Sequence, residues 1–162
     1  MSATSSYLAR VIYKTHSSGT GFEGTYNLIL KANNIPNPLG KRNTIETTTY
    51  EDDQQTFIAG IRQAEQRDIS GNLEKEYLDS LSDLEGEELD IIHLYGSKGI
   101  GEVAKVGYRG TASVSIGDLS GVDQVVSLTA TITPTTVSKK ITDEYTVVDN
   151  NDGSFTVSKK GV

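Results

Sequence analysis

The chain has 162 residues, which suits one domain, and its lack of cysteine excludes a disulfide framework, a thiolate metal site and a thiol nucleophile. The net charge is −7 with no basic cluster, which argues against tight binding to nucleic acid. No segment approaches the roughly 20 apolar residues that cross a membrane, and no signal peptide is apparent, so we expect a soluble protein made in the cytosol.

Sixteen glycines and many threonines and valines favour a mainly β architecture, whose first strand is predicted over residues 7–14. Residues 19–24 match the spelling of a dinucleotide-binding fingerprint. That motif needs a helix whose N-terminus holds a pyrophosphate, whereas residues 25–31 are strand-like. We therefore interpret residues 19–24 as a loop and expect no cofactor.

Residues 36–60 combine a proline-rich loop, a threonine-rich strand over residues 44–50, an acidic turn and the start of a further strand at Phe57. In the threonine-rich strand only Ile45 and Tyr50 are large and apolar. A strand that is polar on both faces has little to bury, so we predict that it pairs or packs against another chain. A solvated hairpin arm is the alternative interpretation.

Residues 61–69 fit either a helix or a strand, and the turn at 70–71 ends them. One helix is then predicted by apolar residues at helical spacing: Leu73, Tyr77, Leu78, Leu81 and Leu84. Asn72 is available as its N-cap, and Gly86 follows its end. The apolar stripe should face the sheet, with the acidic residues turned outward.

Residues 74–90 contain eight acidic residues and one basic residue, Lys75, so their net charge of −7 equals that of the whole chain. The acidic residues are Glu74, Glu76, Asp79, Asp83, Glu85, Glu87, Glu88 and Asp90. Their spacing does not match a calcium-binding loop, so we expect no metal. We predict an acidic surface that faces either the outside or the lumen of an aqueous channel.

Three further strands are predicted over residues 89–95, 102–116 and 122–133, with His93 as a packed or edge residue of the first. In the third strand one face is predicted to be buried: Val122, Val126, Leu128, Ala130 and Ile132. A turn signal at residues 149–153 then predicts a terminal hairpin. With few apolar residues it is either a partner-binding arm or a loosely held tail.

No catalytic constellation emerges, because neither histidine has a recognisable relay partner and no nucleophile motif is present. A purely carboxylate-based enzyme stays open as a class, as glycosidases show, but no pair of carboxylates is singled out. We therefore expect a protein that is not an enzyme.

Two segments carry a resemblance to a known family. The first is residues 43–62, NTIETTTYEDDQQTFIAGIR, and the second is residues 121–136, GVDQVVSLTATITPTT. The first resembles the polar strand, acidic turn and aromatic-isoleucine-x-glycine segment of the major tail tube proteins of long-tailed, non-contractile bacteriophages. The second is similar to the last core strand and threonine-proline ending of that family. With the order of elements between them, the resemblance covers roughly residues 5–136.

The resemblance implies a tail-tube β-sandwich over residues 1–136 with one flanking helix, a long β-hairpin loop at 33–55 that contacts another subunit, and a C-terminal hairpin extension at 137–162. Six copies would close into a ring, and stacked rings would form the tube of the virion through which DNA is ejected. The candidate interface residues are Ile35, Leu39, Ile45, Thr47, Thr49, Tyr50 and Phe57.

The implied partners are further copies of the chain and other tail proteins, namely the tape measure, tail terminator and distal tail proteins. DNA would pass without specific binding, and no membrane is involved. One alternative is a monomeric β-sandwich module that binds carbohydrate or a surface through some of the eight tyrosines. Another is the tube protein of a contractile tail or a secretion system.

Overall fold

The computed structural model describes residues 8–17, 21–39, 42–46, 57–62, 66–119 and 121–160, with the backbone alone for 42–46 and 57–62. The strands in these residues are β1 (Arg10–Thr15), β2 (Gly24–Leu28), β3 (Ala32–Asn34), β4 (Arg42–Glu46), β5 (Phe57–Arg62), β6 (Arg67–Asn72), β7 (Glu88–Tyr95), β8 (Ala104–Ile116), β9 (Ser127–Pro134), β10 (Lys139–Lys140), β11 (Tyr145–Asp149) and β12 (Ser154–Lys159). The helix is α1 (Lys75–Ser82). The predicted mainly β class is confirmed.

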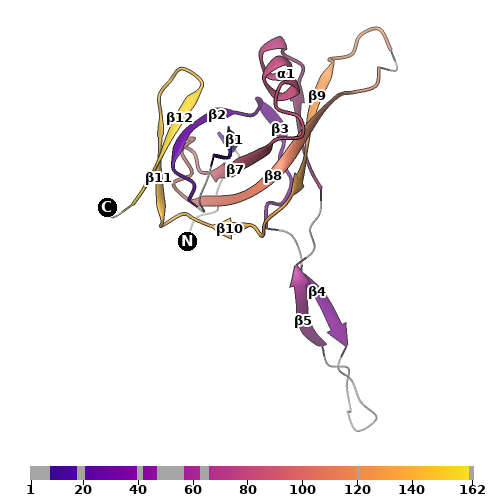
Figure 1. Ribbon diagram of the computed structural model, residues 1–162. Helices are drawn as coiled ribbons and strands as arrows, with labels where there is room; N and C mark the ends of the chain where they lie inside the picture. Colours follow the sequence, from indigo (N-terminus) through magenta and orange to yellow (C-terminus); the bar gives the residue numbers. More distant parts are fainter. Residues whose placement is uncertain are drawn as a thin grey trace.

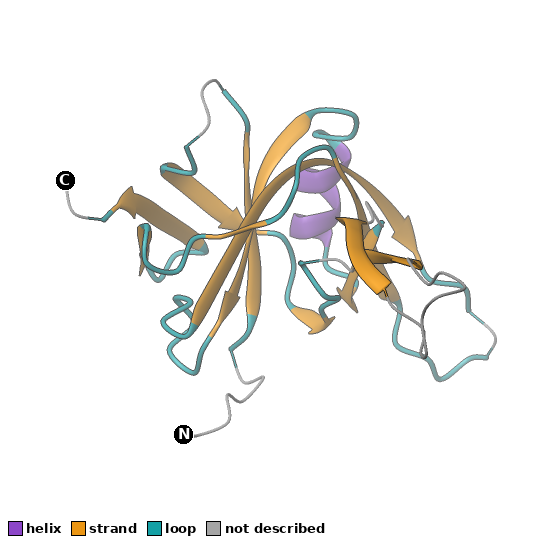
Figure 2. Ribbon diagram, turned by 90° about the horizontal axis from the view of Figure 1, so that it is seen from below, coloured by secondary structure: helices purple, strands orange, loops and turns teal. Residues whose placement is uncertain are grey.

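One antiparallel sheet dominates the structure, with the strand order β11-β12-β2-β1-β7-β8-β9-β6-β3 and with β10 paired to β8. The long strand β8 pairs with β7 over residues 104–111 and with β9 over residues 110–116. Because these two neighbours are offset along β8, the sheet curls round on itself, as Figures 1 and 2 show. Ten of the described strands thus form one curled sheet, and β4 and β5 form a separate pair, so the expected sandwich of two stacked sheets is not confirmed.

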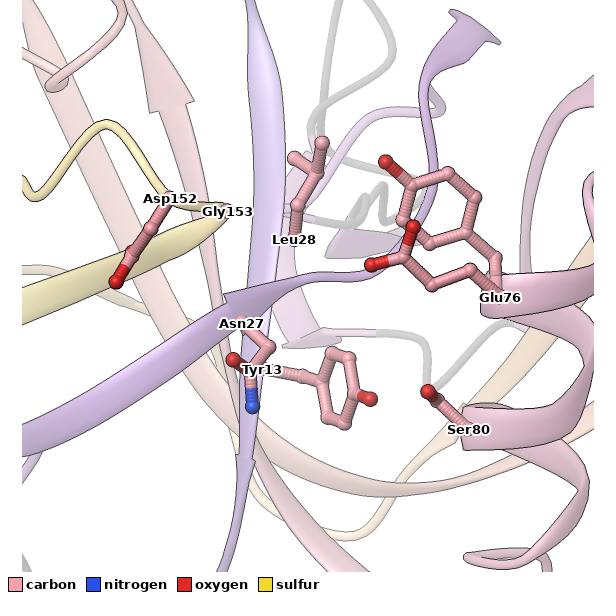
Figure 3. Close-up of a pocket in the computed structure, with 8 residues that line it drawn as sticks. Tyr13, Asn27, Leu28, Glu76, Ser80, Asp152 and Gly153 are labelled. Carbon is pink, nitrogen blue, oxygen red and sulfur yellow. The ribbon is translucent and has the colours of Figure 1, made fainter.

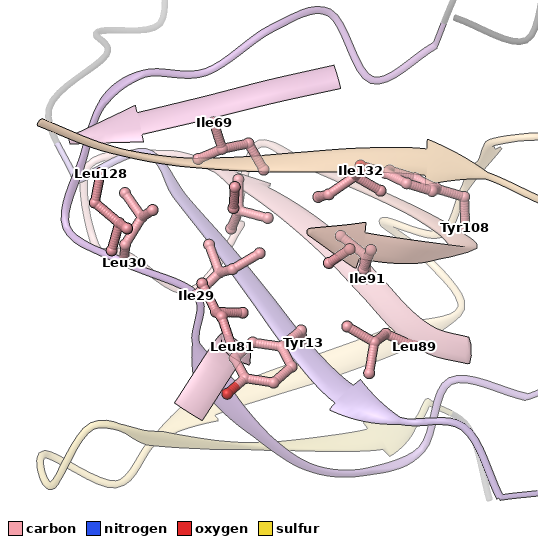
Figure 4. Packing of buried hydrophobic residues seen from close by; sticks show 13 residues of the cluster. Tyr13, Ile29, Leu30, Ile69, Leu81, Leu89, Ile91, Tyr108, Leu128 and Ile132 are labelled. Atoms are coloured by element: carbon pink, nitrogen blue, oxygen red, sulfur yellow. The ribbon is translucent and has the colours of Figure 1, made fainter. Parts of the chain in front are cut away.

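The central strands are buried on both faces, because successive side chains of a strand point to opposite sides. Val11 and Ile12 of β1, for example, belong to two different apolar clusters. The helix-side cluster, shown in Figure 4, contains Leu81 of α1 near Tyr13 of β1. The hairpin-side cluster consists of Ile12, Phe22, Tyr26, Ile92, Leu94, Ile141, Tyr145, Val147, Phe155 and Val157.

The predicted terminal hairpin is confirmed as β11 and β12, but the expectation of a loosely held tail is wrong. Strand β12 pairs with β2, so the hairpin extends the main sheet. Its side chains Tyr145, Val147, Phe155 and Val157 are buried in the hairpin-side cluster. A hairpin with few apolar residues is stable here because β1, β2 and β7, together with Phe22 and Ile141, supply the rest of its core.

Helix α1 is where the apolar spacing predicted it, and all five residues of the stripe pack on or within the helix-side cluster. Asn72 is not its N-cap, because it ends β6, where it pairs with Ser127 of β9. Glu74 takes that position without a side-chain cap bond. Gly86 lies past the helix end with φ +83, as predicted. Gly24 begins β2, so the expectation that no helix follows the 19–24 segment is also confirmed.

The strand predicted over residues 122–133 begins later, at Ser127. Leu128, Ala130 and Ile132 are buried, as the alternation predicted, but Val122 is 98% exposed. The Gly117 N–H donates to the Ser127 carbonyl and closes the β8–β9 ladder there, so residues 118–119 and 121–126 lie outside the ladder. Of residues 61–69, the described residues 61–62 belong to β5 and residues 67–69 belong to β6.

Substitution of Gly71 by alanine tests how closely β6 approaches the chain before β3. A Cβ atom at this position would overlap the backbone oxygen of Lys31 and lie 2.9 Å from Leu30 Cδ1. We expect Gly71→Ala to lower the free energy of unfolding by about 1–3 kcal/mol, since packed cores resist added volume. Gly121→Ala is the matched control, because its nearest atoms are 4.0 Å away. Equal urea midpoints for the two variants would contradict the predicted close approach.

Candidate functional site

The β4–β5 hairpin contains residues 44–46 of the threonine-rich segment and forms a two-stranded sheet of its own. Its register pairs Ile45 with Ile58 and Glu46 with Phe57. Figure 1 shows it projecting away from the curled sheet. The candidate interface residues Ile45 and Phe57 therefore lie on adjacent strands of this hairpin, whereas Thr47, Thr49 and Tyr50 lie outside the described residues.

The other two interface candidates precede the hairpin and differ in burial. Ile35 is partly buried against the helix-side cluster, so it contributes to the core of its own chain. Leu39 is exposed, and its backbone N–H donates to Asn37 Oδ1 at 3.0 Å. This bond forms a local Asx turn, as expected for an asparagine between prolines. Leu39 is thus the candidate of this pair that remains on the surface.

Seven of the eight carboxylates predicted to form an acidic surface are exposed: Glu74, Glu76, Asp79, Asp83, Glu85, Glu87 and Glu88. Asp79 pairs with Lys75 at 2.9 Å, one helical turn away. Glu85 Oε1 accepts a hydrogen bond from the Val114 N–H at 2.9 Å, which joins the acidic surface to the second half of β8. The helix therefore presents a negative face to solvent beside the β8–β9 connection.

Asp90 is a correction to the predicted acidic surface, because its side chain is fully buried. Its carboxylate forms ion pairs with Lys14 Nζ at 3.2 Å and with Arg109 Nε at 3.0 Å, and it lies 3.2 Å from His16 Nδ1. Strand pairing of β1, β7 and β8 brings these groups together. A buried carboxylate with several cationic partners has a structural role, and it contributes no negative charge to the surface.

His93 forms a second buried polar group on the opposite face of β7. Its Nε2 lies 2.8 Å from the Tyr108 hydroxyl, and the Arg67 guanidinium stacks 4.3 Å from the centre of the Tyr108 ring. Burial and the positive charge of Arg67 lower the pKa of His93 to about 3, so the imidazole is neutral at pH 7. Burial also raises the pKa of Tyr108 to about 12. The prediction of a packed histidine is confirmed, and its partner Tyr108 was not predicted.

A polar pocket of about 200 Å³ lies between α1, strands β1 and β2, and the turn between β11 and β12. Figure 3 shows Glu76 and Ser80 of the helix facing Tyr13 and Asn27, and residues of the β11–β12 turn complete the lining. The lining contains no histidine, cysteine, lysine or arginine. The pocket offers hydrogen-bonding groups and negative charge. It does not present the nucleophile activated by a neighbouring histidine or lysine base that covalent catalysis commonly uses.

Within the described ranges, no group of three or more His, Cys, Asp or Glu side chains is placed to hold a metal ion. Helix α1, the helix of the described chain, is too short and too polar to cross a membrane.

Sequence reasoning missed one surface, the β8–β9 loop over residues 117–126. Residues 122–126 of this loop were predicted to begin a buried strand because Val122 and Val126 continue the alternation of β9. The run Gly117-Asp118 together with Gly121 indicates a turn, since glycine and aspartate disfavour a continuous ladder, but it does not show that the turn extends to residue 126.

Comparison with known proteins does not identify a family. No protein-family model matches the chain, and no curated protein sequence matches it significantly.

Proposed function

We propose that the chain is the subunit of a self-assembling tube, as in the major tail tube of long-tailed, non-contractile bacteriophages. Copies would close into rings, six per ring by the resemblance, and stacked rings would form the conduit for DNA in the virion. The observation that carries the proposal is the β4–β5 hairpin outside the curled sheet (Figure 1). A lone two-stranded hairpin is marginal in water, so a neighbouring copy would supply its packing.

Two other features support this proposal. The exposed Leu39 lies near the hairpin and provides apolar area for an interface. The acidic surface of α1 would repel DNA, which suits a tube that lets DNA pass without holding it. In this function the chain has no catalytic role, and its partners are further copies and the proteins at the two ends and in the lumen of the tube.

The test is removal of the hairpin. Strands β3 and β6 already pair with each other, Ala32 opposite Gly71, so a short glycine-serine linker can replace residues 38–65 without breaking the main sheet. We expect the variant to keep its β-type circular dichroism and cooperative unfolding but to form no rings or tubes. Negative-stain electron microscopy and size-exclusion chromatography at high concentration make the comparison with the wild-type chain.

Val103→Gln serves as the control, because it changes an exposed valine of the turn before β8 and leaves the hairpin intact. It should assemble as the wild-type chain does. A wild-type chain that stays monomeric at every concentration, or a hairpin-free variant that still forms tubes, would contradict the proposal.

A monomeric binding module is the second candidate, and the polar pocket is the observation that favours it. Its tyrosine platform has less support, because Tyr13, Tyr26, Tyr108 and Tyr145 are buried. If this candidate holds, removal of the hairpin leaves the oligomeric state unchanged, and titration with saccharides shifts the NMR signals of Asn27 and Tyr77 in the pocket.

A further inference from the structure

Half of the eight large apolar side chains that the described part of the chain exposes belong to the β8–β9 connection. They are Ile116 (51% exposed), Leu119 (59%), Val122 (98%) and Val125 (75%). Single exposed apolar residues are ordinary on a protein surface, but four within ten residues form a patch of the kind that binds a partner. Figure 1 shows this connection projecting beyond the sheet at the same end as α1.

The charge of this loop is negative. Residues 116–126 contain Asp118 and Asp123 and no lysine or arginine. Both aspartates are exposed, and neither has an ion pair within the described residues. The bond from the Val114 N–H to Glu85 places one carboxylate of the acidic surface beside the end of β8 that leads into this loop. A complementary partner would therefore offer an apolar contact bordered by positive charge.

The chain itself carries such a surface in residues 135–140, named here the β10 segment. It contains Val137, which is 74% exposed, and the exposed Lys139 and Lys140, with no acidic residue. Lys139 pairs with Glu144 at 3.2 Å, but both side chains are about half exposed or more, and such surface pairs hold their members weakly. Both lysines are thus available to a partner.

The loop and the β10 segment lie at opposite ends of β9. This strand has eight residues, so about 26 Å separates the two surfaces within one copy. They cannot contact each other in the same chain. A second copy displaced along β9 can bring its β10 segment onto the loop, and the same displacement applied again adds a third copy.

We propose that the β8–β9 loop of one copy docks on the β10 segment of the next copy. Val122 and Val125 contact Val137, while Asp118 and Asp123 face Lys139 and Lys140. The contact is head-to-tail and open-ended, which is the geometry that stacks copies into a filament. It rests on the proposed function and adds a contact distinct from that of the β4–β5 hairpin.

Cysteine cross-linking tests the contact directly, because the chain has no cysteine of its own. A Val122→Cys/Val137→Cys variant cannot form the bond within one copy, since a disulfide needs Cα atoms within about 7 Å. Mild oxidation should give a ladder of dimers, trimers and larger species on a non-reducing gel. The ladder should form at least about ten-fold faster than with the matched Val103→Cys/Val137→Cys control. Equal rates for the two variants would overturn the proposal.

Charge reversal in the same cysteine background provides the second test. Asp118→Lys/Asp123→Lys makes both surfaces positive, and Lys139→Glu/Lys140→Glu makes both negative. We expect each variant alone to lose the ladder at least ten-fold and an equimolar mixture to restore it, because every contact in the mixture pairs opposite charges. Full cross-linking of either variant alone, or a mixture that stays uncross-linked, would overturn the proposal.

These results are distinguishable from failure of the proposed function. If the wild-type chain forms tubes and both charge-reversed variants form them equally well, the contact is wrong and the tube function stands. If the wild-type chain stays monomeric and the cysteine variant gives no ladder, both proposals are overturned.

Discussion

Replacement of Asp90 by asparagine is expected to lower the free energy of unfolding by about 3–5 kcal/mol. The carboxylate is fully buried and pairs with Lys14 and Arg109 at 3.2 and 3.0 Å. Asparagine keeps the shape of the side chain but removes its charge, so these two cations lose their counter-ion. Because their side chains are each only 15% exposed, water compensates them poorly.

Urea unfolding followed by circular dichroism measures this loss. Asp79→Asn is the matched control, because it removes a carboxylate from an exposed pair with Lys75 on α1 and should cost less than about 0.5 kcal/mol. If Asp90→Asn costs no more than the control, the cations around Asp90 are hydrated in the folded protein, and the buried cluster has no structural importance.

The second large effect is the dependence of stability on His93 at acid pH. Its folded-state pKa of about 3 lies below the value of about 6.5 in an unfolded chain. Between these values the unfolded chain binds a proton that the folded chain does not, so acid favours unfolding. The contribution is fully present above pH 6.5 and is lost as the pH falls, by up to about 1.4 kcal/mol per unit.

Comparison with His93→Gln isolates the contribution of His93 to the pH dependence of stability, because the contributions of the other titrating groups are common to both proteins. We expect the stability of the wild-type chain relative to the variant to fall by about 3 kcal/mol between pH 8 and pH 4. Urea unfolding at several pH values gives this difference. The His93 ring signals in NMR spectra should also stay at their neutral positions down to about pH 5. A difference in stability that does not change with pH would show that His93 is accessible to water.

Local patterns in the sequence predicted elements whose stability depends on nearby residues. The spacing of Leu73, Tyr77 and Leu81 predicted α1, because a helix repeats every 3.6 residues regardless of the rest of the chain. Alternation likewise predicted the buried face of β9 through Leu128 and Ile132. The same alternation continued to Val122, and there it misled, because alternation does not show where strand pairing ends.

The candidate surfaces were predicted less completely, because local patterns do not show which residues the tertiary fold buries. Leu39 is exposed, but Ile35 belongs to the core of its own chain, a distinction that depends on where the chain folds back onto α1 and the sheet. Residues 122–126 of the apolar β8–β9 loop were predicted as strand because their valines are suited equally to a strand. Only the position of the last β8–β9 backbone bond, at Gly117 and Ser127, separates the two interpretations.

The sequence by itself determined the mainly β class, the one helix, the terminal hairpin and the acidic character of the 74–88 region. These follow from composition and short-range periodicity, which act through neighbouring residues. Tertiary structure alone decided that Asp90 is buried and that the terminal hairpin joins the main sheet. Both depend on strand pairing between distant segments, β1 with β7 and β2 with β12. Contacts across such separations leave no periodic trace in the sequence.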